Sequence, residues 1–147
     1  MNEWAKHFFK KSQKEKGFLY CCKRTVIIRS ITGNERIEVQ WKYGKTKNIE
    51  KRMKFYDDSY ELLYSYPVNH LSLREKMIHE SPEIEDNRHL YMKNGKDEHV
   101  DFDICETVKF FATSKIELNK KYEGLYIGNE NNWYNFPHYI LMELLHF

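Results

Sequence analysis

The sequence of 147 residues lacks long apolar runs and carries few cysteines. No run approaches the ~18 apolar residues that a membrane-spanning helix needs, and the N-terminus has no apolar stretch of the kind found in signal peptides. The three cysteines, Cys21, Cys22 and Cys105, are an odd number. Neighbours in sequence rarely bridge each other, so this set suits a reducing compartment. These absences predict a cytoplasmic protein that does not enter a membrane.

The sequence also lacks the common motifs of cofactor, metal and catalytic sites. Its six glycines are too scattered to form a phosphate-binding loop between a strand and a helix. The cysteines and histidines do not show the short ligand spacings of zinc sites, and no Ser, His and acid set has a local signature of a hydrolase. The sequence therefore predicts no cofactor, no metal site and no catalytic residue.

Charge is distributed unevenly along the chain, although the net charge is only +2. Residues 1–56 carry 15 Lys and Arg against 5 Asp and Glu, whereas residues 57–106 carry 5 against 13. Such asymmetry predicts a charged partner for one or both halves. The alternative is that folding interleaves the two blocks, since a sheet brings distant strands together.

Hydrophobic periodicity predicts a single α+β domain over residues 1–147, in which a mostly antiparallel sheet packs against N-terminal and C-terminal helices. The expected helices cover residues 2–16, 60–65 and 72–80, with a final helix from Pro137; the tyrosines also permit a strand over residues 60–65, and Pro67 should end either element. The expected strands cover residues 18–22, 25–31, 36–43, 52–56, 107–111, 115–118 and 125–127. Loops are expected over residues 44–51 and 128–135.

The most informative stretch covers residues 88–118. Apolar residues at positions 100, 102 and 104 alternate with Asp101 and Asp103, which is the period of a half-buried strand. The dipeptide Asn94-Gly95 predicts a hairpin with the preceding strand. A three-residue loop is favoured over a two-residue loop because it puts the apolar residues of both strands on one face. The acidic side chains then face solvent.

Acidic residues are concentrated around this predicted hairpin. A carboxylate surface suits a basic protein partner, since opposite charges speed association and supply ion pairs across an interface. Tyr91 and Tyr126 add aromatic anchors of the kind that interfaces favour. The candidate partner-binding residues are Glu83, Glu85, Asp86, Tyr91, Asp97, Glu98, Asp101 and Asp103.

RNA binding or RNA cleavage is the alternative function. Basic grooves with aromatic platforms bind single-stranded nucleic acid, and the basic N-terminal half interleaves Lys and Arg with residues such as Trp41 and Tyr43. His89 and His99 flank the predicted turn and could act as general acid and base. The simpler interpretation is that the aromatic residues pack in the core and that the two histidines are exposed beside carboxylates.

The opening Met1-Asn2-Glu3-Trp4-Ala5-Lys6 resembles the starts of some immunity proteins of bacterial contact-dependent growth-inhibition systems. The overall format is similar too, namely a small α+β chain without catalytic motifs. The resemblance covers only the N-terminal end and transfers no binding residue. It implies a protein that binds the toxin domain of its own system and blocks the active site. A nuclease toxin is the expected partner, because nucleases act on a polyanion and are basic, which suits an acidic inhibitor.

Overall fold

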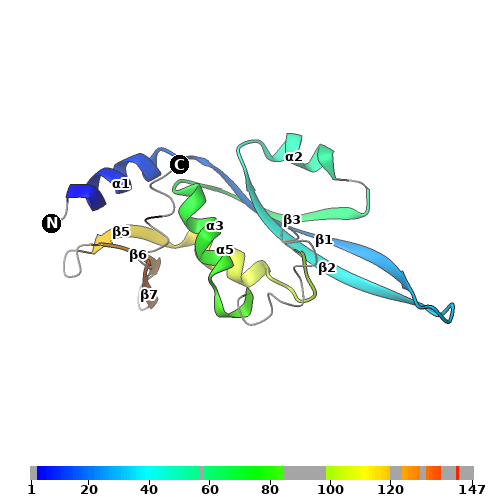
Figure 1. The fold of residues 1–147 in the computed structure, drawn as a ribbon. Helices are drawn as coiled ribbons and strands as arrows, with labels where there is room; N and C mark the ends of the chain where they lie inside the picture. Colours follow the sequence, from blue (N-terminus) through cyan, green and yellow to red (C-terminus); the bar gives the residue numbers. More distant parts are fainter. Residues whose placement is uncertain are drawn as a thin grey trace.

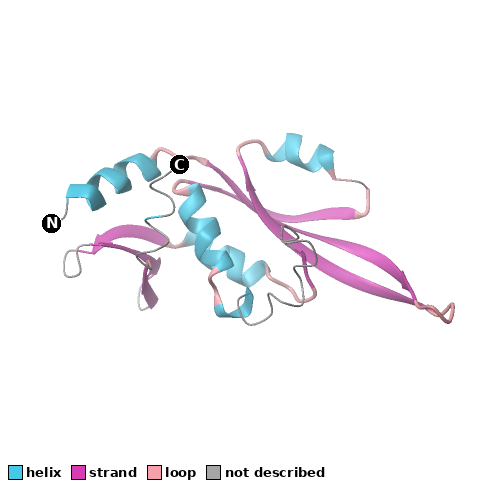
Figure 2. Cartoon of the chain, in the orientation of Figure 1, coloured by secondary structure: helices cyan, strands magenta, loops and turns pink. Residues whose placement is uncertain are grey.

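The computed structural model describes residues 3–56, 58–84, 99–119, 124–129, 132–136 and 142. Its helices and mostly antiparallel sheets form an α+β fold, as the sequence predicts (Figures 1 and 2). The helices are α1 (Glu3–Gln13), α2 (Ile49–Phe55), α3 (Leu71–His79) and α5 (Cys105–Thr113). The strands are β1 (Gly17–Arg29), β2 (Glu35–Thr46), β3 (Tyr60–Val68), β4 (His99–Val100), β5 (Lys115–Asn119), β6 (Gly124–Asn129) and β7 (Asn132–Asn135).

A long hairpin of β1 and β2 forms the centre of the main sheet, whose strand order is β3-β1-β2-β4. The two strands pair antiparallel without interruption over residues 18–29 and 35–46. Within the described residues, β3 pairs with β1 only as far as Arg24, and β4 pairs only with residues 41 and 42 of β2. The end of the hairpin therefore extends beyond its neighbouring strands, and Figure 1 shows it projecting from the rest of the protein.

The turn of this hairpin covers residues 30–34. Gly33 has a φ of 85°, in the left-handed region that glycine enters readily. The N–H of Ser30 donates to the carbonyl of Asn34 at 2.8 Å and closes the loop. The strands predicted over residues 25–31 and 36–43 do form a hairpin. The strand predicted over residues 18–22 belongs to the same strand β1, because residues 23 and 24 also pair with β2.

One face of the hairpin carries the core of the protein. Leu19 and the cross-strand pair of Cys21 and Tyr43 are buried on this face, which packs against α3 and α5. Ile78 of α3 and Val108 of α5 are fully buried in the same cluster. The second sheet, ordered β5-β6-β7, adds its own buried residues to this cluster. The strands predicted over residues 115–118 and 125–127 are β5 and β6, and the first predicted helix is α1.

The first wrong prediction concerns residues 44–56, where α2 replaces a loop and a strand. Asn48 begins this helix, because its side-chain oxygen accepts the N–H of Lys51 at 3.0 Å, as an N-cap residue does. The residues that follow are mostly Glu, Lys, Arg and Met, which have high helix propensity. β2 also continues three residues into the predicted loop, to Thr46.

The helix favoured over residues 60–65 is also wrong, since this segment belongs to β3. Residues 58–61, Asp-Ser-Tyr-Glu, fit a capping box that favours a helix, but the pairing of β3 with β1 overrides this local signal. Pro67 lies inside the strand instead of ending it. β3 is an edge strand, where the missing N–H of a proline is tolerated.

The strand predicted over residues 107–111 is part of the helix α5. The buried residues Cys105, Val108, Phe111 and Ala112 are spaced by three and four, which is the period of a helix with one buried side. β7 similarly occupies part of the loop predicted over residues 128–135.

The helix predicted over residues 72–80 is confirmed as α3, with Leu73 and Met77 buried as expected. Residues 72–75, Ser-Leu-Arg-Glu, fit a capping box that predicts Ser72 as the N-cap, and this prediction is wrong. The N-cap residue is His70, which has a φ of 50°, and the hydroxyl of Ser72 donates instead to the carboxylate of Glu15.

The predicted acidic hairpin falls largely on residues 85–98, outside the part of the chain that the structure describes, so its register stays a prediction. Its described end is β4, which pairs with β2. The strand does not continue to Ile104, because the chain bends at residues 101 and 102 and α5 begins at Cys105. The final helix predicted from Pro137 also lies outside the described residues, apart from Met142.

Candidate functional site

The eight predicted partner-binding residues divide into two groups. The structure places three of them next to the N-terminal end of α5, namely Glu83, Asp101 and Asp103. The other five lie outside the described residues and stay predictions: Glu85, Asp86, Tyr91, Asp97 and Glu98.

Asp103 and Glu83 stabilise the first turn of α5. The carboxylate of Asp103 accepts the N–H of Cys105 at 2.9 Å, and the hydroxyl of Thr107 donates to the carboxylate of Glu83. Acidic side chains at a helix N-terminus satisfy free N–H groups and interact favourably with the helix dipole. These two carboxylates therefore have a structural role, whatever else they contact.

Replacing Asp103 by alanine is expected to lower the free energy of unfolding by about 1 kcal/mol, because an N–H of α5 loses its acceptor. Urea unfolding followed by circular dichroism would measure this loss. The exposed Asp58 gives a matched control, since Asp58→Ala should change stability by less than about 0.5 kcal/mol. Equal effects of the two substitutions would contradict the stabilising role of the hydrogen bond between Asp103 and the N–H of Cys105.

The hairpin carries an apolar surface on the continuation of the core-facing side of the sheet. Ile27 lies directly opposite Ile37, and Val39 is the next apolar residue of β2 on the same side. Ile27 is 63% exposed, Ile37 is 74% exposed and Val39 is 37% exposed. We refer to Ile27, Ile37 and Val39 as the hairpin stripe. Ile31 adds a further exposed apolar side chain in the turn.

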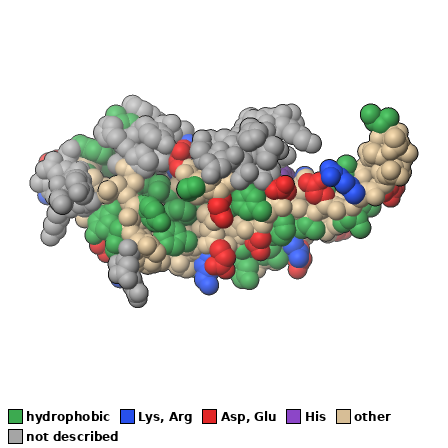
Figure 3. Space-filling view, turned by 90° about the horizontal axis from the view of Figure 1, so that it is seen from below, with side chains coloured by type: hydrophobic (Ala, Val, Ile, Leu, Met, Phe, Trp, Pro, Cys, Tyr) green, Lys and Arg blue, Asp and Glu red, His purple; other side chains and the backbone are tan. Residues whose placement is uncertain are grey.

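Asp101 lies beside the hairpin stripe. Together with Ile37, Val39 and Trp41, it lines a shallow hollow of about 460 Å³ at the outer edge of β2. Figure 3 shows hydrophobic, acidic and basic side chains interleaved on the lower face of the molecule, between its body and the projecting hairpin. Of the three described acidic candidates, Asp101 is therefore the one that shares a surface with exposed apolar residues.

The sequence analysis did not identify the hairpin stripe. The alternation along β2 correctly predicts which residues share a side, but it also led us to expect that this side is buried. Burial depends on where the helices stop covering the sheet, which is a tertiary property. Tyr43 is buried while Ile37, six residues along the same side, is exposed.

The residues of the alternative RNA function have structural partners. His89 lies outside the described residues, and His99 places its Nε2 at 2.8 Å from the hydroxyl of Tyr60. Arg24 donates to the same hydroxyl at 2.8 Å and to Gln40 at 2.9 Å. This row of polar contacts crosses β3, β1, β2 and β4, so His99 helps to join the four strands.

The three cysteines are buried free thiols. The Sγ atoms of Cys21 and Cys105 lie 3.0 Å apart, and both residues are buried. Burial raises the pKa of Cys21, and raises the pKa of Cys22 and of Cys105 to about 11. A thiol with a raised pKa is a poor nucleophile at neutral pH, because the thiolate is the reactive form.

Among the residues that the structure describes, no group of three or more His, Cys, Asp or Glu side chains could hold a metal ion. No helix in the described part of the chain has the length and apolar character needed to cross a membrane. Comparisons of the chain with protein-family models, with curated proteins and with solved structures find no match.

Proposed function

We propose that this chain acts by binding another protein, and that it is an immunity protein that neutralises a basic toxin, expected to be a nuclease, in the cytoplasm. The observation that carries the proposal is the exposure of the hairpin stripe on a projecting hairpin. Contiguous exposed apolar side chains are typical of interaction surfaces. Because the stripe lies on paired strands, little conformational entropy is lost when a partner orders it.

Charge around the stripe supports a basic partner. At the end of the hairpin the charges compensate each other, since Arg29 pairs with Glu35 at 2.8 Å. Asp101 borders the stripe in a hollow that Arg36 and Glu38 also line, and these two side chains pair with each other at 3.5 Å. An apolar centre with an acidic border complements an enzyme whose active-site cleft is basic because its substrate is a polyanion. A projecting hairpin is also a suitable shape for entering such a cleft.

The test compares the wild-type chain with Ile27→Asp/Ile37→Asp as immobilised baits in nuclease-treated lysate of the cells that make the protein. We expect one basic protein bound in stoichiometric amount by the wild type, with affinity on the order of 100-fold lower for the double variant. The wild-type chain should also inhibit the nuclease activity of that purified protein, and the double variant should not.

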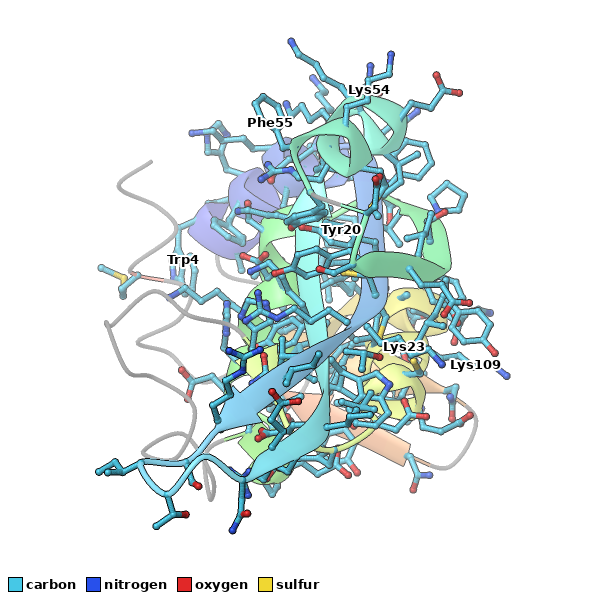
Figure 4. All side chains as sticks on the ribbon, turned by 90° about the vertical axis from the view of Figure 1, so that its right-hand side faces the viewer. Trp4, Tyr20, Lys23, Lys54, Phe55 and Lys109 are labelled. Atoms are coloured by element: carbon cyan, nitrogen blue, oxygen red, sulfur yellow. The ribbon has the colours of Figure 1, made fainter. Side chains whose placement is uncertain are left out.

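Phe55 supplies the matched control, because it is 77% exposed on α2 and projects outward from the helix (Figure 4). Phe55→Asp should bind and inhibit like the wild type. Circular dichroism and thermal unfolding should show that both variants keep the fold, since none of the three side chains is buried. Equal capture by the double variant, or a captured protein whose activity the chain does not inhibit, would overturn the proposal.

A further inference from the structure

We propose that a pocket between α1, the end of β2 and α3 binds a small anion that carries two or more phosphoryl groups. The pocket has a volume of about 580 Å³. Five lysines line it, and we refer to it as the lysine pocket: Lys11, Lys14, Lys45, Lys47 and Lys76. It lies at the opposite end of β2 from the hairpin turn, so this inference does not depend on the proposed function.

The first argument is the excess of positive charge. Two carboxylates, Glu15 and Glu75, also line the pocket, which leaves three more positive than negative charges. Of the five lysines, Lys45 lies 3.8 Å from one of these carboxylates, Glu75. Like charges held close together repel each other, so this arrangement is stabilised when a polyanion binds between them.

The lysines come from three separate parts of the chain. Lys11 and Lys14 lie in and just after α1, Lys45 and Lys47 at the end of β2, and Lys76 in α3. A run of lysines on one helix is often only a solvated surface. Here the fold gathers lysines from distant segments around one concave site, which is the arrangement that concentrates a positive field.

At one end of the pocket, the hydroxyl and the N–H of Ser72 donate to the same carboxylate oxygen of Glu15. Lys45 donates to the hydroxyl of Ser72 at 3.0 Å. The two donors of Ser72 belong to the first turn of α3 and hold an anionic oxygen of the chain itself.

The lowered pKa of Glu75 indicates that positive charge dominates in this part of the lysine pocket. Burial tends to raise the pKa of this carboxyl group, yet the hydrogen bond from His79 and the charges of Lys45, His79 and Lys76 hold its pKa below the usual value. The local potential is therefore positive enough to outweigh desolvation.

The size and walls of the pocket favour a compact ligand. A pocket of this volume is in the range of small-molecule sites. Its apolar wall is formed by Phe8 and Leu73, which are buried against the core and cannot offer a ring surface for stacking a base. A phosphate chain such as that of a nucleoside polyphosphate or an inorganic polyphosphate matches the positive charge of the pocket. Comparing tripolyphosphate with RNA distinguishes such a ligand from a nucleic-acid backbone.

The test is calorimetric titration of the full chain with inorganic tripolyphosphate at moderate salt. We expect saturable binding at one site, weakened about tenfold or more in Lys14→Gln/Lys47→Gln. The control is Lys51→Gln/Lys54→Gln on α2, which removes the same charge from exposed residues outside the pocket and should change affinity less than twofold; Lys54 points away from the body of the protein (Figure 4). Amide NMR shifts should locate the ligand, with the largest changes at Ser72 and Leu73.

A single-stranded RNA oligonucleotide with the same number of phosphates distinguishes the two sources of phosphate. Tighter binding of tripolyphosphate than of RNA, with the pocket variant alone impaired, supports a small-anion site. If RNA binds more tightly, or if both double variants lose affinity equally, the lysines act as a diffuse basic surface and the proposal fails. Absence of saturable tripolyphosphate binding would overturn it as well.

Discussion

Arg74→Ala is expected to lower the free energy of unfolding by about 3–5 kcal/mol. Among the charged residues, no other single substitution is expected to have so large an effect. Arg74 is buried, and its partners are carbonyl and amide oxygens. Its guanidinium donates to the carbonyls of Phe111 and Ser114 at 2.9 and 2.6 Å, and to the backbone and side-chain oxygens of Asn69 at 2.7 and 3.0 Å.

These contacts explain why the loss should be large. The carbonyls of Phe111 and Ser114 lie at the C-terminal end of α5, where a cation interacts favourably with the helix dipole. Alanine would leave several buried acceptors without a donor, and each unsatisfied group costs about 1–3 kcal/mol. Burial lowers the pKa of Arg74 to about 10, so the guanidinium still carries its charge at neutral pH.

Urea unfolding of Arg74→Ala beside Arg36→Ala would test this expectation. The side chain of Arg36 is 72% exposed and pairs with Glu38 at 3.5 Å, so its removal should change stability by less than about 0.5 kcal/mol. Arg74→Lys should fall between the wild type and alanine, because one ammonium group cannot reach all the oxygens that the guanidinium contacts. A loss of about 1 kcal/mol or less for Arg74→Ala would contradict the expectation.

The second large effect is a dependence of stability on pH through His70. Burial, followed by the charge of Arg74, lowers the pKa of His70 from 6.5 to about 4. The imidazole is 2% exposed, and its Nδ1 lies 2.8 Å from the hydroxyl of Ser12. The unfolded chain takes up a proton below about pH 6.5 and the folded chain only below about pH 4, so stability falls as the pH is lowered through this window. The total contribution is about 3 kcal/mol.

His70→Asn isolates this contribution, since asparagine tolerates the left-handed backbone conformation of residue 70. The difference in unfolding free energy between wild type and variant, measured by urea unfolding at several pH values from 7 to 4, should change by about 3 kcal/mol over the window. His7→Asn is the matched control, since it makes the same substitution at an exposed histidine. A constant difference between wild type and His70→Asn would show that His70 does not titrate as expected.

The predictions from sequence were most accurate where a segment carries a long periodic pattern. The alternation in β2 and the four-residue spacing in α1 leave one secondary structure that buries the apolar side. The segments over residues 60–65 and 107–111 are short and rich in aromatic residues, so they fit a helix and a strand equally well. Pairing with β1 makes the first segment a strand, and packing against the core makes the second a helix.

The candidate sites were less predictable than the fold. The sequence shows an excess of basic residues in its first half, but it does not show that Lys14 and Lys47 meet Lys76 at one pocket. Nor does it show that β1 and β2 continue past the helices that cover them, which makes the hairpin stripe a surface. Both properties come from the relative placement of elements that are distant in sequence.

The buried cysteines also allow local opening of the main sheet to be followed by chemical modification. Cys21 and Cys22 are adjacent in β1 and point to opposite sides of the sheet, and both are fully buried. A thiol-specific reagent can reach Cys21 only when β1 separates from α5, where Cys105 lies against it, and can reach Cys22 only when the other side of the sheet is uncovered. The order in which the two sites are modified would therefore reveal which side of the sheet loosens first.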